Sequence, residues 1–134
     1  MKTISRETIT REQIHRLGAA GLRGFFRLAD LWNLSVDDQR VLLGSPPRST
    51  FFDWKKDPQR ALTRDTLERL SYLIGIYKAL QILFHDSSIA DRWIHRAADA
   101  PPFGGKTPLH FMLRGDIAAL YEVRRYLDAW RGAW

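Results

Sequence analysis

The sequence contains no cysteine, and this absence excludes two kinds of architecture. Without thiols the chain can form neither a disulfide framework nor a metal site built on thiolates, as is usual for cytoplasmic proteins. Long apolar runs are missing too. No stretch approaches the roughly 18 residues of a membrane span, and residues 1–25 lack the apolar core of a signal peptide. With 134 residues and no internal repeat, we expect one compact domain or two small ones sharing a core, in the cytoplasm and away from membranes.

Patterns that carry catalysis or hold a cofactor are absent as well. The four histidines (His15, His85, His95 and His110) form no HExxH pattern and lie beside no plausible catalytic triad. Residues 104–107 (Gly-Gly-Lys-Thr) resemble the end of a phosphate-binding loop, but the first glycine of such a loop is missing at the required spacing. The carboxylates lie next to basic residues or at helix starts, which suggests no general acid–base pair. We therefore predict that the chain is not an enzyme and that it binds neither a metal nor a cofactor.

Acidic residues are outnumbered, so the chain is basic, with a net charge of +6 and an isoelectric point near 10.1. Most of the excess lies in residues 1–60, which hold 11 Lys and Arg against 7 Asp and Glu. Residues 61–134 hold 10 against 8. A basic chain suits nucleic acid, a membrane surface or an acidic partner, and it also fits simple solubility. Charge therefore permits nucleic-acid binding by the N-terminal half without requiring it.

The first periodic segment runs from about residue 10 to residue 32. A capping box at residues 10–13 (Thr-Arg-Glu-Gln), with Thr10 as the cap, marks its start. Apolar residues recur at helical spacing, so we expect one long helix, or two helices, with a bend or a close packing contact at the glycines near position 20. One face of this segment is a candidate dimer surface, and an ordinary place in the core is an equal alternative. The residues of that face are Leu22, Phe25 and Phe26.

Two short helices with a tight connection follow. Ser35 caps the first helix, predicted at residues 36–43, and Gly44 ends it. Two prolines prevent the helix from continuing, so residues 44–48 form a turn. The second helix is predicted at residues 49–56. Two short helices joined in this way, with a basic second helix, describe a helix-turn-helix.

The outward face of the second short helix is the predicted DNA-binding surface, with Phe51 and Trp54 turned to the core. In such motifs the first residues of the second helix reach base edges, while Lys and Arg hold phosphates. Asp53 is unusual there, because a carboxylate repels phosphate, accepts from a cytosine amino group, or pairs with Arg48 or Lys56. A solvated basic face on a helical hairpin is the alternative. The predicted DNA-binding residues are Arg48, Ser49, Thr50, Phe52, Lys55 and Lys56.

The longest periodic segment is predicted to be a central helix at residues 64–84 that bridges the two halves of the chain. Thr63 is its expected cap, and Gly75 allows close packing against a neighbouring helix. A short helix, capped by Ser88, is predicted at residues 89–97.

The last thirty residues are predicted to form a helix, a bend and a second helix. Thr107 followed by Pro108 is a strong helix start. Gly115 can adopt the left-handed conformation that ends this short helix. Asp116 then favours the start of the last helix, whose apolar stripe continues as far as Trp130.

This C-terminal segment resembles the C-terminal half of the Xre/MbcA/ParS antitoxin family. The matching residues are Pro108 at the helix start, Leu113 and Gly115 at the bend, and Val123, Leu127 and Gly132 beyond it. Residues 49–56 (Ser-Thr-Phe-Phe-Asp-Trp-Lys-Lys) resemble the Xre-type recognition helix. The resemblance implies an all-α fold with two domains. An N-terminal Xre-like helix-turn-helix domain, residues 1–60, is joined by the central helix to a toxin-binding domain, residues 61–134.

The resemblance further implies the antitoxin of a type II toxin–antitoxin pair. The usual partner in this family is an NAD-degrading toxin with the RES fold, and the C-terminal end of the antitoxin blocks the entrance to the toxin's active site. A homodimer would read operator DNA and repress its own operon, and it would form a larger assembly with the toxin. A plain repressor, or an adaptor of the ParS type with another partner, are the alternatives.

The residues expected to meet the toxin are inferred from their chemistry, because interfaces are enriched in Trp, Tyr and Arg. A place in the chain's own core is the alternative for Trp130. The predicted toxin-binding residues are Arg124, Arg125, Tyr126, Trp130, Arg131 and Trp134.

Overall fold

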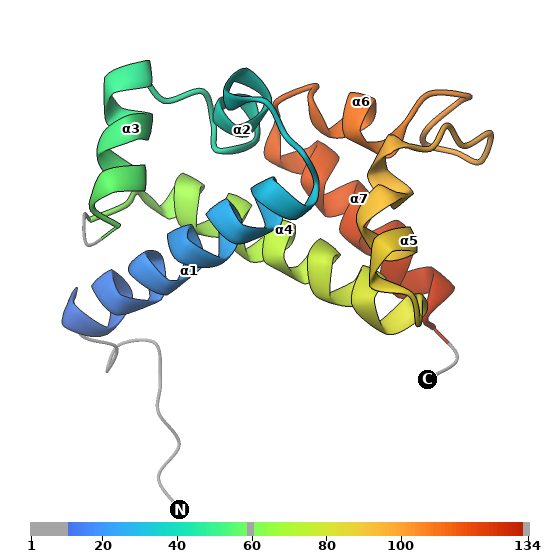
Figure 1. Cartoon of the computed structure of the whole chain (residues 1–134), viewed down its shortest axis with the longest axis horizontal. Helices are drawn as coiled ribbons and strands as arrows, with labels where there is room; N and C mark the ends of the chain where they lie inside the picture. The colour runs from blue at the N-terminus through green and yellow to red at the C-terminus, as the bar shows by residue number, and fades with distance from the viewer. Residues whose placement is uncertain (1–10, 59–60, 133–134) are drawn as a thin grey trace, which may run out of the picture.

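All regular elements are helices within residues 11–58 and 61–132, which are the residues that this computed structural model describes. The side chains of residues 11–16 and the predicted cap Thr10 lie outside the description. Figure 1 shows helix α4 running through the molecule, with the short helix α3 at one end and α5 at the other. The prediction of an all-α fold is confirmed.

Helix α1 (Arg11–Leu31) is one continuous helix, despite the glycines near position 20. A methyl group added to Gly18 would lie 3.3 Å from Leu62, and one added to Gly21 would lie 3.3 Å from Leu70. The glycines therefore permit a close approach of α1 to α4 and to the residues just before it. Of the predicted alternatives, a close packing contact is confirmed and a break is not.

The helix-turn-helix consists of α2 (Val36–Leu42) and α3 (Arg48–Lys56). The Ser35 hydroxyl accepts a hydrogen bond from the backbone N–H of Asp38 at 3.1 Å, as a helix cap does. Gly44 and Ser45 adopt φ values of 96° and 59°, which turn the chain sharply between the two helices. Helix α3 buries Phe51 and Trp54 and leaves its opposite face exposed.

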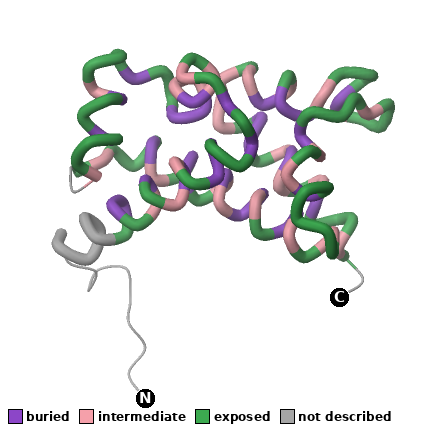
Figure 2. Tube along the Cα trace, viewed as in Figure 1, coloured by how far each residue is buried: buried purple, intermediate pink, exposed green. Residues whose placement is uncertain are grey.

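Helix α4 (Arg64–Leu83) packs against α1 on one side and against the last helix, α7, on another. Its cap is Thr63, whose hydroxyl accepts from the backbone N–H of Thr66 at 3.2 Å. One hydrophobic cluster contains buried residues from α1, α3, α4 and α7, so both halves of the chain share a core. Figure 2 shows buried positions along α4, which packs against α1 and against α7.

The C-terminal half adds α5 (Ser87–Arg92), the 3₁₀ helix η2 (Trp93–His95), α6 (Pro108–Met112) and α7 (Ile117–Trp130). The predicted cap Ser88 is wrong, because the Asp86 carboxylate accepts from the backbone N–H of Ser88 at 2.9 Å. The Thr107 cap is confirmed, as is Gly115, which has a φ of 94° at the bend between α6 and α7.

None of the helices in the described ranges combines the length and apolar character that a membrane span requires.

Candidate functional site

One face of α3 is exposed along its whole length. Ser49, Phe52, Asp53 and Lys56 share this face, because positions three, four and seven apart lie on one side of a helix. The ring of Phe52 is 42% exposed even though it contacts the ring of Phe51 at 5.2 Å. The face therefore presents a hydroxyl, an aromatic ring, a carboxylate and an ammonium group side by side.

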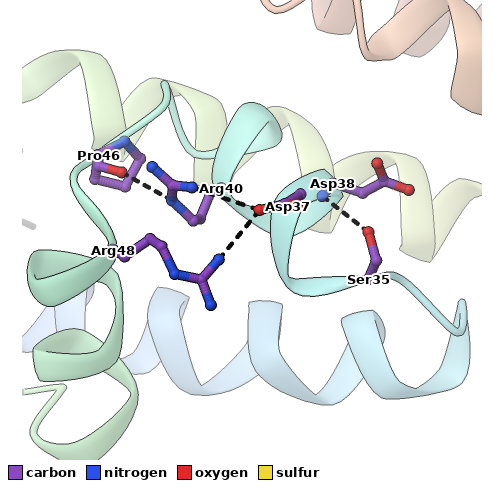
Figure 3. Close-up of polar contacts among 6 residues, drawn as sticks. All are labelled: Ser35, Asp37, Asp38, Arg40, Pro46 and Arg48. Carbon is purple, nitrogen blue, oxygen red and sulfur yellow. Dashed lines mark hydrogen bonds and ion pairs between the residues drawn. The ribbon is translucent and has the colours of Figure 1, made fainter.

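Arg48 is held in place by a carboxylate of the preceding helix. Its Nη1 lies 3.3 Å from Oδ1 of Asp37, and Arg40 also approaches Asp37 at 3.5 Å (Figure 3). The Nε of Arg40 donates to the carbonyl of Pro46 at 3.1 Å, so α2 also fixes the turn before α3. These contacts orient α3 relative to α2.

The Asp53 carboxylate has no partner among the described residues. The suggested pairing of Asp53 with Arg48 is therefore wrong, because Asp37 takes the guanidinium group, and no Asp53–Lys56 pair forms. A free carboxylate on this face remains available to an external donor.

The remaining predicted DNA-binding residues differ in exposure and in their contacts. Arg48 and Lys56 are exposed, and the guanidinium carbon of Arg48 lies 5.6 Å from the centre of the Phe52 ring. Lys55 is exposed too, but its Nζ lies 5.9 Å from the ring of Phe26 on α1. Thr50 is only half-buried and lies at the edge of the face.

The residues proposed as a dimer surface are mostly not on the surface of the chain. Leu22 and Phe25 are fully buried in the core of this chain, which is the alternative considered for them, so they offer no area to a second copy. Phe26 is half-buried between Phe25 and Phe51, at 5.5 and 5.6 Å between ring centres. The exposed leucines of α1 are instead Leu17 and Leu31, which sequence reasoning missed.

Helix α7 carries most of the predicted toxin-binding residues, and they point in different directions. Arg124 lies over Gly75 of α4, and its Nε donates to the Asp128 carboxylate at 3.0 Å. Arg125 is exposed and has no partner within the described part of the chain. Arg131 is half-buried, and Trp134 lies outside the described residues.

Aromatic rings hold the outer part of α7. Tyr126 stacks on Trp93 at 6.1 Å between ring centres and meets the edge of Phe103 at 5.1 Å. Trp130 contacts Phe84 at 5.8 Å and Tyr126 at 6.3 Å. Trp130 nevertheless remains 53% exposed, so it lies at the border of the core and does not complete it.

A shallow hollow of about 240 Å³ lies between α7 and the loop before α6. Prediction from the sequence found Arg125 and Tyr126 but not the other lining residues, because the hollow exists only where the loop folds against the helix. The lining residues are Pro101, Pro102, Glu122, Arg125, Tyr126 and Ala129.

The bend between α6 and α7 is tied to the rest of the molecule by charged groups. Arg114 donates to both oxygens of Asp116, at 2.7 and 2.9 Å, which lowers the pKa of Asp116 from 3.8 to about 2. The buried Arg69 of α4 donates from Nη1 to the carbonyl of Gly115 at 2.8 Å and from Nε to Asp65 at 2.9 Å. A methyl group on Gly44 would lie 3.1 Å from Arg69, so the helix-turn-helix turn rests on the same guanidinium group.

Metal-binding geometry is not found in the described residues, where no three His, Asp or Glu side chains gather into a group that could hold an ion. The exposed face of α3 and the outer part of α7 present hydrogen-bonding groups, charges and apolar area.

The chain matches the profiles of two protein domains and resembles a protein from another organism. The profile of the antitoxin Xre-like helix-turn-helix domain matches residues 15–75. That of the antitoxin Xre/MbcA/ParS C-terminal toxin-binding domain matches residues 79–133. The uncharacterized protein y4oB of Sinorhizobium fredii (strain NBRC 101917 / NGR234) is 54% identical over 113 residues, which are 84% of this chain and 85% of that protein. Neither matched family is enzymatic, in agreement with the prediction that the chain is not an enzyme.

Proposed function

Because the chain belongs to the Xre/MbcA/ParS antitoxin family, we propose that it neutralises a RES-type, NAD-degrading toxin by covering the toxin's active-site entrance. The covering element is the end of α7 together with the residues that follow it. A second role is to bind operator DNA as a homodimer in the cytoplasm and so repress the operon that encodes both partners.

The exposure of Trp130 is the main support for the proposal that the end of α7 covers the active-site entrance of the toxin. An indole that is 53% exposed, at the end of a helix, retains a large area for burial against a partner. Its contacts with Phe84 and Tyr126 keep the ring in a defined position. Fixed aromatic residues lose little conformational entropy on binding and are enriched among the residues that dominate interface energies. Trp130 is therefore suited to enter or cover a cleft on the toxin.

The exposed face of α3 supports the operator-binding part. Lys56 can contact a phosphate, and Phe52 offers apolar contact to a thymine methyl group in the major groove. The unpaired Asp53 carboxylate can accept from the amino group of cytosine. Two copies of α3 in a symmetric dimer would meet two half-sites about one helical turn apart.

Co-expression with the product of the adjacent reading frame tests the proposal. The complex is purified on a tag carried by the antitoxin, and NAD consumption is compared with that of the partner expressed alone. The proposal expects a stable complex that leaves NAD intact and a free partner that consumes it. A partner that does not bind, or that consumes NAD equally in the complex, would contradict it.

A further inference from the structure

The hollow beside α7 is a second feature of the C-terminal surface, and its lining does not include Trp130. We propose that it anchors the toxin by receiving one apolar side chain, with a carboxylate beside that side chain pairing with Arg125. This inference rests on the proposed toxin binding and specifies a contact separate from the cover formed by the helix end.

The size of the hollow indicates whether it can hold a small molecule or a single side chain of a partner protein. Its volume of about 240 Å³ lies below the roughly 300–1,000 Å³ of small-molecule sites. An apolar cavity of about 150 Å³ is large enough for benzene. The hollow therefore fits a single aromatic or branched aliphatic side chain better than a cofactor or a nucleotide.

The walls of the hollow are fixed before any partner arrives. Tyr126 is held by Trp93 and Phe103, and Phe103 is itself buried. The loop that carries Pro101 and Pro102 is closed at its base by two backbone hydrogen bonds. The N–H of Ala98 donates to Lys106 at 3.1 Å, and the N–H of Gly105 donates to Ala98 at 2.8 Å. A preformed site avoids the cost of ordering its own side chains on binding.

Two charged side chains stand on the rim of the hollow. Glu122 and Arg125 are three positions apart on α7, and neither makes a hydrogen bond or ion pair with a described residue, although Glu122 interacts at longer range with the charge of Arg114. A guanidinium group pairs best with a carboxylate, through two parallel hydrogen bonds. A carboxylate accepts from an N–H group. The complementary partner surface thus carries an apolar side chain, an acidic residue on the Arg125 side and a donor on the Glu122 side.

Arg125 is available for a contact with the toxin, whereas the neighbouring Arg124 is already engaged within the chain. Arg124 is half-buried over Gly75 and already bonded to Asp128. Arg125, one position later, is exposed and lines the hollow. The two adjacent arginines therefore have different tasks, one within the chain and one toward a partner.

Filling the hollow is the direct test. Ala129→Trp places a bulky side chain in the hollow, and Ala118→Trp is a matched control, because Ala118 is also exposed on α7. The two alanines are about 16 Å apart along the helix and lie on the same side of it. Affinity for the purified product of the adjacent reading frame is measured by calorimetry for wild type, both tryptophan variants and Arg125→Gln. Thermal unfolding and operator binding confirm that each variant is folded.

Ala129→Trp should weaken the complex by about tenfold or more, the loss expected at a central interface position. Ala118→Trp should bind within about twofold of wild type. Arg125→Gln should lose affinity and show a weaker salt dependence, and it carries the test if Ala129→Trp does not fold. Wild-type affinity for both Ala129→Trp and Arg125→Gln, or equal losses for the two tryptophan variants, would overturn the inference while leaving toxin binding intact. Failure of wild type to bind would instead contradict the proposed function.

Discussion

The guanidinium group of Arg124 on α7 occupies the space that a side chain at Gly75 on α4 would fill. Helices α4 and α7 approach closely at this point, and the arginine closes the gap while it pairs with Asp128 at 3.0 Å. Glycine inside a helix costs about 1 kcal/mol relative to alanine. Its presence in the middle of α4 is explained by the room that Arg124 requires.

Gly75→Ala should therefore change the free energy of unfolding differently in the presence and in the absence of Arg124. With Arg124→Ala the added methyl group meets no guanidinium, and the better helix propensity should stabilise the fold by about 0.5–1 kcal/mol. With Arg124 present, the methyl group must displace the arginine, and the gain should vanish or reverse by about 1 kcal/mol. Urea unfolding of the four proteins in the cycle measures this coupling. Equal effects in both backgrounds would show that the two residues do not compete for the same space.

Arg69→Ala should weaken the junction between the two halves of the chain. It removes the donor to the Gly115 carbonyl and the support beneath Gly44. We expect a loss of about 2 kcal/mol in the free energy of unfolding, because Arg69 is buried and its partners lose their hydrogen bonds. Asp65→Ala is the control and should cost less than about 1 kcal/mol, since that carboxylate is half-exposed. Equal losses in urea unfolding would argue against a special role for the Gly115 contact.

Lys56→Ala should weaken DNA binding by a similar factor on all sequences. An ammonium group that holds a phosphate releases counterions, so its removal should lower the salt slope by about one. Lys55→Ala should have a smaller effect, because its ammonium group lies against Phe26 on α1. Fluorescence titration of operator and unrelated duplexes at several salt concentrations measures both quantities. An unchanged slope for Lys56→Ala would show that α3 does not face the phosphates in this way.

Asp116→Asn should reduce the sensitivity of the fold to acid. The hydrogen bonds from Arg114 lower the pKa of Asp116 in the folded chain to about 2, below its ordinary value of 3.8. The charged form thus contributes stability above pH 3.8, and this contribution is lost as the pH falls toward 2. Asparagine keeps a side chain that suits a helix start but does not titrate. Melting temperatures between pH 5 and pH 2 should fall less steeply in the variant, and parallel curves would contradict this account.

Helix starts were predictable where the cap and its acceptor are close in sequence. Ser35, Thr63 and Thr107 each bond an N–H three residues ahead, so the local pattern contains the whole interaction. The start of α5 was misplaced because Asp86 and Ser88 both suit a cap and only the folded backbone chooses between them. Local chemistry therefore locates an element without always deciding its first residue.

Surfaces were harder to predict, because they depend on contacts between distant segments. Phe25 and Phe52 have the same side chain, yet Phe25 is fully buried in the core and Phe52 is 42% exposed. Arg124 and Arg125 are identical in type and adjacent, yet Arg124 packs over Gly75 and pairs with Asp128 while Arg125 is exposed. The hollow required the loop at residues 98–106 to fold against α7, which no periodicity in the sequence reveals.

The central claim is that the end of the chain inhibits the toxin. The most direct test is to remove residues 130–134. The chain without residues 130–134 is co-expressed with its partner, and NAD consumption by the purified complex is compared with that of the full-length complex and of a Lys56→Ala complex. We predict that the shortened chain still folds and binds DNA but no longer prevents NAD consumption, whereas Lys56→Ala protects fully. Complete protection by the shortened chain would contradict the account and place the inhibitory element elsewhere on the antitoxin.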